Sequence, residues 1–435
     1  MESIVSCPWF PNCSGCSAIG RSYGEQLATK LKQVRRLFAE ARIPAFDADR
    51  ITKIHPSEQV SGYRNRVRLV PAYKSSQSEM NRDSPPPAGG ADARGTGIAL
   101  GLYREDSHFV VDIPQCPVQA AGINRVLEDT RSGIESAGLR LYDESTHRGD
   151  LRFVTVRQGV NTGELLVGLV TRTDSPEGVR EVADYIVSRN AEVTGVVQNI
   201  NPRSGNVVFG AKTTLLTGRD YLEELVCDVH IRLGLTSFFQ VNTGVAEQAY
   251  RAIQVGLMLT ADDVLVDLYC GVGSIGLTTA RHVSKVIGIE EVGEAVHFAI
   301  ESARANGIRH AEFQVGKVED RLPRLVKQLQ RDGVPGDRLK LAVNPPRKGI
   351  PRRIVDVILE AQPSRIAYLS CSPVTLVRDS KLLAEGGYRL QRVELLDMFP
   401  QTDQVETLVV LECAAESSDA PVLRRREGSR RPRRR

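Results

Sequence analysis

Two side chains of this sequence, the Cys371 thiol and the Glu406 carboxylate, are placed to carry out covalent chemistry together. Cys371 directly follows the apolar run RIAYLS, and Glu406 opens the last strand-like run of the chain. A thiolate is a strong nucleophile, and a carboxylate within reach of the reacting group can remove a proton. The alternative reading is a core cysteine and an exposed glutamate on an edge strand.

A glycine-rich stretch that could bind a nucleotide precedes both residues. It reads DLYCGVGSIG, with glycines at 271, 273 and 276, and it follows the apolar run VLVDLY. Glycines let the backbone turn tightly and approach a ligand, and Glu290, at the end of the next strand run, can accept hydrogen bonds from ribose hydroxyls. This spacing alone leaves a dinucleotide and S-adenosylmethionine equally open, and Cys270 is expected to be a small apolar filler.

A polar segment, Asn344-Pro-Pro-Arg347, directly follows the apolar strand run KLAV. The Asn344 amide can accept a hydrogen bond from N3–H and donate one to O4, which matches uracil. Uracil C5 is a poor nucleophile until a thiolate adds at C6; it can then attack a sulfonium methyl group, after which a base removes the C5 proton. Cys371, ionised with help from Arg347, and Glu406 suit these two roles.

The elements that position these residues alternate between strand and helix from about residue 264. The strand runs VLVDLY, KVIGIE, EFQV, KLAV and RIAYLS predict a parallel, doubly wound α/β sheet. Two further runs, YRLQRVELLD and QVETLVVLEC, are joined by the short loop MFPQTD and predict a terminal hairpin. The last strand is then antiparallel to the others, so Glu406 is expected at the rim where the parallel strands end.

The first half of the chain predicts a mixed α+β domain. Leu27, Leu31, Val34 and Phe38 recur at helical spacing, so residues 23–42 are expected to form a helix that packs on the catalytic domain. Short β-like runs, from IALGLY to NVVFG, follow between residues 97 and 235. The expected organisation is an N-terminal domain (1–235) with a flexible loop at about 74–96, a catalytic domain (236–415) and a disordered Arg-rich tail (416–435).

Composition excludes several classes of protein. The chain has 435 residues, 41% hydrophobic and 25% charged, which is typical of a globular protein and not of a disordered or fibrous one. No apolar run reaches the ~18 residues of a membrane span, and the N-terminus lacks the features of a secretory signal. Eight cysteines are too few for a disulfide scaffold. We expect a cytoplasmic monomer whose arginine tail binds phosphate backbones or stays solvated.

Five separate motifs give the chain a strong resemblance to the RNA 5-methyluridine (uracil-C5) methyltransferases, which use S-adenosylmethionine. The motifs are the N-terminal cysteines, SFFQVNTGVAEQ, DLYCGVGSIGL, NPPRKG, and SCSPVTLVRD followed by DMFPQTDQVE. The resemblance implies a Rossmann-like methyltransferase domain, with Cys371 as nucleophile and Glu406 as proton acceptor. It also implies a cofactor and base pocket lined by Gln240, Tyr269, Gly271, Gly273, Glu290 and Asn344. The family usually has Asp at position 344 and Asn at 372, where this chain has Asn344 and Ser372.

The cysteine cluster is a further motif. Its spacing, Cys7-x5-Cys13-x2-Cys16 with a distant Cys116, leaves zinc, an iron–sulfur cluster or no metal open. The resemblance to the iron–sulfur branch of the family implies a [4Fe–4S] cluster on these four cysteines. C5 methylation by this route needs no electron, so such a cluster would serve structure or RNA positioning.

RNA is the expected partner. The stretch GYRNRVR at 62–68 interleaves an aromatic residue with three arginines, as an RNA-contacting strand does, although a solvated basic strand reads the same way. Phe238 or Phe239 could stack on a base or belong to the core. Cys7 lies near the start with no TRAM barrel before it, as in the shorter bacterial 23S rRNA methyltransferases, so 23S rRNA is expected and tRNA is the rival. A nicotinamide-dependent oxidoreductase and a non-catalytic RNA-binding protein are the alternatives from other classes.

Overall fold

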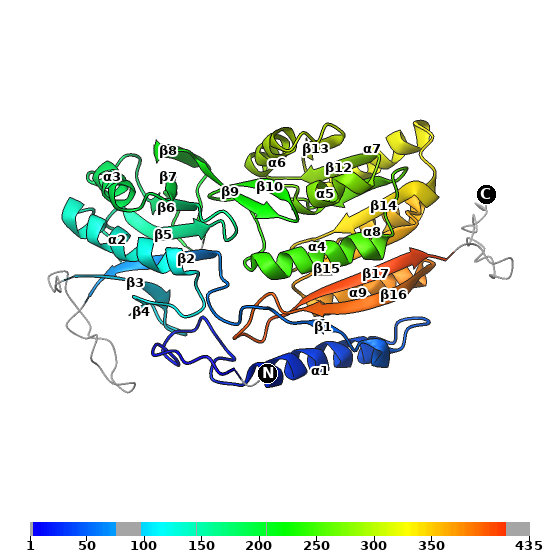
Figure 1. Ribbon diagram of the computed structural model, residues 1–435, viewed down its shortest axis with the longest axis horizontal. Coiled ribbons are helices and arrows are strands. Elements are labelled where there is room, and N and C mark those ends of the chain that lie inside the picture. The colour runs from blue at the N-terminus through cyan, green and yellow to red at the C-terminus, as the bar shows by residue number, and fades with distance from the viewer. Residues whose placement is uncertain (1–2, 75–96, 145, 206, 415–435) are drawn as a thin grey trace, which may run out of the picture.

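The computed structural model describes residues 3–74, 97–144, 146–205 and 207–414. The arginine tail and nearly all of the predicted flexible loop lie outside these residues. Two β-sheets lie side by side along the long axis of the molecule, one built mainly from the first half of the chain and one from the second (Figure 1).

The larger sheet carries the candidate site. Its eight strands run in the order β1-β16-β17-β15-β14-β11-β12-β13. All neighbours are parallel except β17, which is antiparallel to both β15 and β16. The predicted doubly wound sheet with a terminal hairpin is therefore confirmed. The strands are β1 (Ile54–His55), β11 (Val264–Leu268), β12 (Lys285–Glu290), β13 (Ala311–Val315), β14 (Leu339–Val343), β15 (Arg365–Ser370), β16 (Tyr388–Leu396) and β17 (Glu406–Cys413).

Alternate residues of these strands supply two separate cores, one on each face of the sheet, as expected when both faces are covered. Val266 belongs to the core under one helical layer, and its neighbour Leu265 belongs to the core under the other. The first layer is α7 (Val318–Arg331), α8 (Arg352–Ala361) and α9 (Pro373–Glu385), and the second is α4 (Thr243–Leu257), α5 (Ser274–Thr279) and α6 (Gly293–Ala305).

The smaller sheet has seven strands in the order β4-β3-β2-β5-β6-β7-β8, and helices α2 and α3 pack on it. The run NVVFG, expected as a strand, lies outside the strands in its described residues, 207–210. The elements are β2 (Arg66–Tyr73), β3 (Ile98–Tyr103), β4 (Val110–Asp112), α2 (Ala121–Ala137), β5 (Leu151–Gln158), β6 (Leu165–Thr171), α3 (Val179–Arg189), β7 (Val193–Ile200) and β8 (Lys212–Gly218).

A hairpin and three short 3-10 helices complete the described structure. The hairpin of β9 and β10 touches the small sheet through β7 and the large sheet's helix α6 through β10. It therefore joins the two halves of the molecule. The elements are β9 (Tyr221–Val226), β10 (Val229–Gly234) and the 3-10 helices Ala48–Arg50, Ala280–His282 and Gly336–Arg338.

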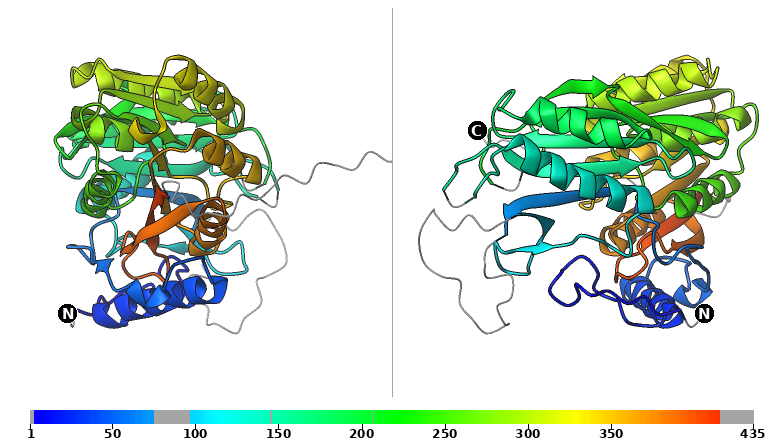
Figure 2. Two further views of the ribbon diagram at one scale, coloured as in Figure 1. Left: turned by 90° about the vertical axis from the view of Figure 1, so that its right-hand side faces the viewer. Right: turned by 60° about the vertical axis from the view of Figure 1, so that its left-hand side comes forward.

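The N-terminal segment runs beneath both halves (Figure 2). Helix α1 (Tyr23–Ala41) begins at a capping box made by Ser22 and Glu25 and packs against α9, as the sequence predicts. The fully buried residues of α1 include Gln26 and Lys30, whereas Leu27 and Leu31 of the predicted apolar stripe are only partly buried. Strand β1 then adds to the large sheet beside β16.

Candidate active site

The strand register brings Cys371 and Glu406 together. Antiparallel pairing sets Ser370 of β15 opposite Thr407 of β17. The same register, continued by one residue, sets Cys371, which follows Ser370, beside Glu406, which precedes Thr407. The two side chains interact electrostatically, since the Glu406 carboxylate raises the pKa of the Cys371 thiol.

Burial sets the protonation of both groups. Glu406 is 2% exposed, and desolvation raises its pKa to about 8, although Gln240 and Arg347 beside it act in the opposite direction. The Cys371 thiol is half-buried, and its pKa is raised by desolvation first and by Glu406 second. Arg347 lowers that pKa, as the sequence predicts, but does not overcome the other two effects.

Arg347 is held over this pair by the chain around it. Its Nη2 donates to Gln404 Oε1 at 3.2 Å, and its carbonyl accepts from Thr375 Oγ1 at 3.0 Å. Asn344 follows β14 at the same rim, is half-buried, and donates its backbone N–H to Leu268 O at 3.3 Å. The rim of β11, β14, β15 and β17 therefore presents an amide, a guanidinium, a thiol and a carboxylate together.

The glycine loop after β11 is held in left-handed backbone conformations. Tyr269, Gly271 and Gly273 have φ values of 59°, 56° and 76°. Such a φ is uncommon for a residue with a side chain, so the turn at Tyr269 is a constrained one. Glu290 Oε2 accepts from Gly271 N at 3.0 Å and its Oε1 from Val292 N at 2.9 Å, so this carboxylate ties the loop to the end of β12.

The rim fits a polar cofactor. Buried polar atoms normally have a hydrogen-bond partner, yet two atoms here, Asp267 Oδ1 and Tyr269 Oη, lack one among the described residues. A Cβ placed on Gly271 would meet nothing closer than a backbone oxygen at 3.6 Å, so the loop leaves room for a ligand. Among these residues the sequence missed only Asp267, whose position in DLYCG was the available signal.

Asp267 also supports the loop. Its Oδ2 accepts from Gly276 N at 3.0 Å, inside α5, while complete burial raises its pKa to about 7. Cys270 is buried between the loop and Gly288, which agrees with its expected role as an apolar filler.

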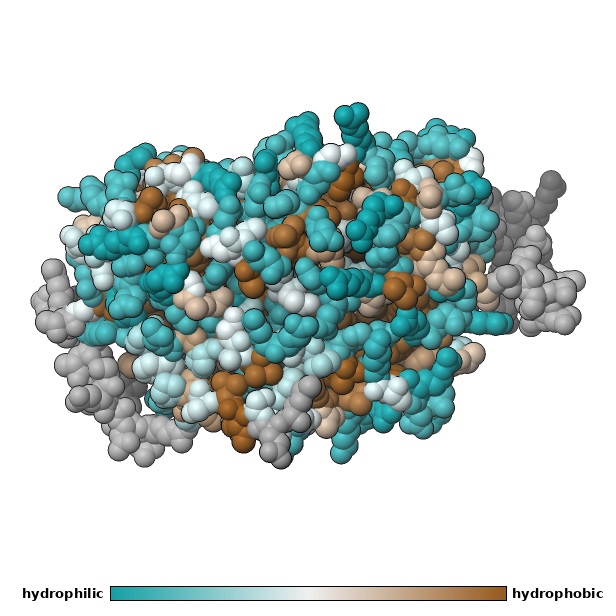
Figure 3. Space-filling model, in the orientation of Figure 1, coloured by the Kyte–Doolittle hydropathy of each residue, from teal (hydrophilic) through white to brown (hydrophobic). Residues whose placement is uncertain are grey.

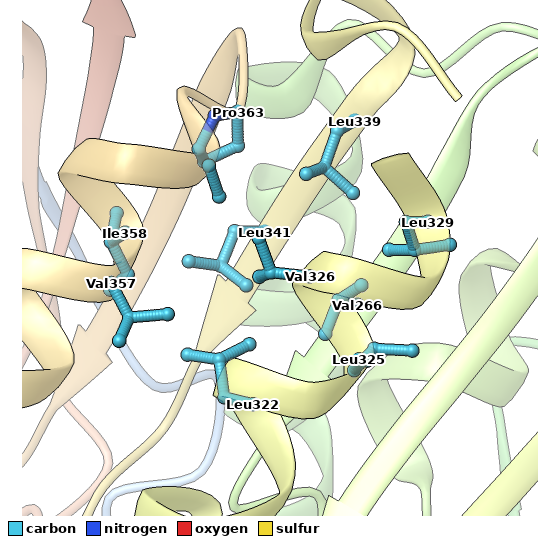
Figure 4. A pocket seen from close by; sticks show the side chains of 11 residues that line it. Val266, Leu322, Leu325, Val326, Leu329, Leu339, Leu341, Val357, Ile358 and Pro363 are labelled. Atoms are coloured by element: carbon cyan, nitrogen blue, oxygen red, sulfur yellow. The ribbon is translucent and has the colours of Figure 1, made fainter. Parts of the chain in front are cut away.

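Two cavities lie elsewhere. An apolar one of about 10 Å³ between α7, α8 and the sheet is lined entirely by core side chains such as Leu322 and Ile358 (Figure 4). It has room for about one water molecule but offers no polar partner for it. A polar pocket of about 160 Å³ lies between Cys227 and α4. Neither cavity is lined by Cys371 or Glu406.

Arg66 and Arg68 lie on the same side of β2 and Arg64 precedes the strand, but the tyrosine does not join them. Tyr63 is 2% exposed and donates its hydroxyl to Pro400 O at 2.9 Å, so it is not a stacking surface for RNA. Arg66 donates to Leu235 O at 3.0 Å and to Ser237 O at 3.2 Å, and stacks over Phe209.

None of the three arginines, Arg64, Arg66 and Arg68, forms an ion pair with a described residue. Phe238 follows Ser237, is 60% exposed and is free to stack, whereas Phe239 is 4% exposed and belongs to the core. The molecular surface in this orientation is mainly hydrophilic, with scattered apolar patches (Figure 3). Of these residues, Arg68 and the ring of Phe238 are exposed and open to a ligand.

The four expected metal-binding cysteines lie in one region. Trp9 Nε1 donates to Gln115 O at 2.8 Å, which brings the N-terminal cysteines to Cys116. Burial first, and then the neighbouring thiols, raise the pKa of Cys13, Cys16 and Cys116. No three Cys, His, Asp or Glu side chains within the described ranges lie close enough to hold a metal ion, so an assembled cluster site is not evident. The donor set itself, four free thiols, fits an iron–sulfur cluster or zinc.

Comparison with known proteins decides the family. The chain is 34% identical over 406 residues to an uncharacterized RNA methyltransferase of Halalkalibacterium halodurans, covering 93% of this chain and 82% of that protein. A relative from Gloeobacter violaceus, also an uncharacterized RNA methyltransferase, is 35% identical over the same shares of the two chains. The family tRNA (uracil-5-)-methyltransferase matches residues 207–414. The chain belongs to the RNA uracil-C5 methyltransferases.

A solved member of the family shares the fold. The crystal structure of Pyrococcus abyssi tRNA (uracil-54, C5)-methyltransferase in complex with S-adenosyl-L-homocysteine has a TM-score of 0.68 and 25% identity, covering 92% of this chain and 86% of that one. The present enzyme is accordingly an S-adenosylmethionine-dependent RNA uracil-C5 methyltransferase, and the oxidoreductase alternative is wrong. No helix among its described residues is long and apolar enough to cross a membrane.

Proposed function

We propose that this methyltransferase modifies C5 of a uridine in 23S rRNA, with Cys371 as nucleophile and Glu406 as base. The observation that carries the residue roles is the register of β15 and β17, which sets the thiol beside a buried carboxylate. The ribosomal substrate rests on the resemblance of the motifs to those of the bacterial 23S rRNA enzymes. All proposed site residues lie in one copy of the chain, so a monomer suffices.

Each polar group at the rim has a role in the proposed mechanism. The Cys371 thiolate adds to C6 of the uracil, which places electron density on C5. S-adenosylmethionine, when bound, supplies the methyl group that C5 takes up. Glu406 then accepts the C5 proton, the C6–S bond breaks, and the double bond between C5 and C6 returns with release of the thiolate. Asn344 holds the uracil edge, and Arg347 favours the ionised thiol.

Tyr269 contributes its unpartnered buried hydroxyl to the cofactor and base pocket, and Gln240 lies there beside Glu406. Gly271 and Gly273 let the loop approach the cofactor, and Glu290, beyond tying the loop, is placed for its ribose hydroxyls. Exposed Arg68 of β2 and exposed Phe238 receive the RNA, and the target base leaves its stack at a cost of a few kcal/mol.

The Glu406→Gln enzyme tests the residue roles. It retains the nucleophile but loses the base, so a methylated covalent enzyme–RNA adduct accumulates and is visible on denaturing gels. Absence of an adduct while Cys371 is intact would contradict the assignment of the base. A Glu360→Gln variant, altered at an exposed position of α8, serves as the control and should release product normally.

Mapping of 5-methyluridine tests the substrate. Total RNA from a strain that lacks the gene should lose the modification at a position of 23S rRNA and regain it on complementation. Loss from tRNA with intact rRNA would establish the rival substrate, which is the one named for the solved Pyrococcus abyssi relative.

We also propose that Cys7, Cys13, Cys16 and Cys116 hold a [4Fe–4S] cluster with a structural or RNA-positioning role. The shared region of the four thiols and their chemistry support this. When bound, the cluster would tie the N-terminal segment to the small sheet. Anaerobically purified protein should be brown and contain iron and sulfide, whereas a colourless protein loaded with zinc would contradict the proposal.

A further inference from the structure

The turn between β16 and β17, residues 397–405, leads directly into Glu406 and is held mainly by the distant N-terminal segment. Gln26 and Gln401 exchange two hydrogen bonds, Gln26 Nε2 to Gln401 Oε1 at 3.0 Å and Gln401 N to Gln26 Oε1 at 2.8 Å. Ala18 N donates to Gln401 O at 3.0 Å. Gln401 thereby keeps a left-handed backbone with a φ of 69°.

A buried ion pair fixes the beginning of the same turn. Lys30 Nζ bonds to Asp397 Oδ1 and also donates to Phe399 O at 3.0 Å. Both charged side chains are at most 1% exposed. Such a pair adds little net stability, but it defines one arrangement, because either charge left alone in the interior is costly.

Further contacts come from the strand segment that follows α1. Asp397 N donates to His55 O at 2.9 Å, Gln401 Nε2 to Val60 O at 3.1 Å, and Tyr63 Oη to Pro400 O at 2.9 Å. Backbone groups along the turn are therefore bonded to residues more than 300 positions earlier in the sequence.

The turn controls two groups of the active site. Glu406 is its C-terminal neighbour and pairs with Leu396, the residue before the turn. Gln404 lies within the turn and accepts the hydrogen bond from Arg347, which neighbours Cys371. A shift of the turn would move both the carboxylate and the guanidinium.

We propose that Gln26 and Lys30 are positioning residues for the catalytic base, acting through the 397–405 turn. This inference rests on the proposed role of Glu406. Neither side chain touches the rim; each holds the turn from which Glu406 emerges. Their loss therefore impairs removal of the C5 proton more than thiolate addition and methyl uptake, because Glu406 directly follows the turn, whereas Cys371 follows β15 and is linked to the turn only through Arg347 and Gln404.

The test measures how a single turnover divides between covalent adduct and released product. Gln26→Ala is compared with Glu406→Gln, with wild type and with Arg36→Ala, a variant at a 75%-exposed position of the same helix. Displacement of a reacting group by about 1 Å slows its step by about 100-fold. We expect the ratio of methylated adduct to released product to be about 100-fold higher in Gln26→Ala than in wild type. Arg36→Ala should match wild type.

This ratio separates positioning from stability, because unfolded enzyme forms neither adduct nor product. If Gln26→Ala lowers total methylation but leaves the ratio unchanged, the positioning role is wrong. If Glu406→Gln forms no adduct, the assignment of the base itself is wrong. Should Gln26→Ala fail to fold, Lys30→Met/Asp397→Leu removes both buried charges together. It should show the same rise in adduct, and an unchanged ratio would overturn the inference.

Discussion

Burial gives the two reactive side chains their character at the scale of single residues. In the free enzyme Glu406 and Cys371 are both shifted towards their neutral forms. Each must lose a proton before it acts, so the reaction depends on neighbours that favour the ions. Arg347 is a cation that lowers the pKa of both groups.

Cys371→Ala should abolish methylation, because without a thiolate at C6 the uracil C5 stays unreactive. We expect a loss of about 10⁴-fold or more, as for removal of other enzyme nucleophiles, and no covalent trapping of RNA. Cys413→Ala, at the end of β17, is the matched control and should keep wild-type activity. Methyl transfer by the Cys371→Ala enzyme at a comparable rate would contradict the mechanism.

The pH dependence of product release should follow Glu406. The carboxylate is the active form and its pKa is raised to about 8, so release from a preformed adduct should increase as the pH rises through that value and then level off. Single-turnover rates of release, measured from about pH 6 to about pH 9.5 in steps of about half a pH unit, test this dependence. In Glu406→Gln the remaining slow release should lose this dependence; a release rate that falls with pH would contradict the assignment.

At the scale of elements, the glycine loop and the strand ends build the site. The sequence predicted these well, because buried parallel strands have continuous apolar runs and glycines mark the tight turn. It also predicted that β17 runs antiparallel and starts at the rim, which placed Glu406 correctly. It did not predict β1, whose two residues carry no pattern, or the coil at 207–210, where an apolar run has no strand partner.

Gly273→Ala should weaken S-adenosylmethionine binding and lower stability. The added Cβ would meet Phe313 Cε1 at 2.7 Å, and the left-handed φ costs about 1–2 kcal/mol for a residue with a side chain. Gly293→Ala, where a Cβ meets nothing within 4 Å, should be neutral or slightly stabilising. Calorimetric titration and urea unfolding measure both effects, and equal behaviour of the two variants would contradict this account.

At the scale of the whole molecule, the N-terminal segment joins the two sheets and the catalytic hairpin. Sequence patterns could not show this, because helix α1 buries Gln26 and Lys30 where its periodicity pointed to leucines. Both polar groups find partners on a turn that lies 375 and 367 positions later in the sequence. Only the folded chain shows that these partners compensate the burial of Gln26 and Lys30. The cysteine region likewise depends on a contact between distant segments.

Lys30→Met should destabilise the protein strongly, because Asp397 is left as a lone buried charge. Loss of one partner of a buried pair costs about 3–5 kcal/mol, whereas replacement of both partners by apolar residues is often neutral. Urea unfolding should therefore show a large loss for Lys30→Met and recovery of most of it in Lys30→Met/Asp397→Leu. If Lys30→Met is as stable as wild type, this account is wrong and water reaches the buried ion pair.

The contacts between α1 and the last hairpin also bear on when the enzyme becomes active during its synthesis. Gln26 is translated 375 positions before its partner Gln401. Until the C-terminal hairpin emerges, Gln26 and Lys30 lack their partners on the turn and β1 lacks β16, the strand beside it. A nascent chain therefore cannot complete a turnover before this hairpin emerges, because the proposed base at position 406 is translated after the turn that positions it.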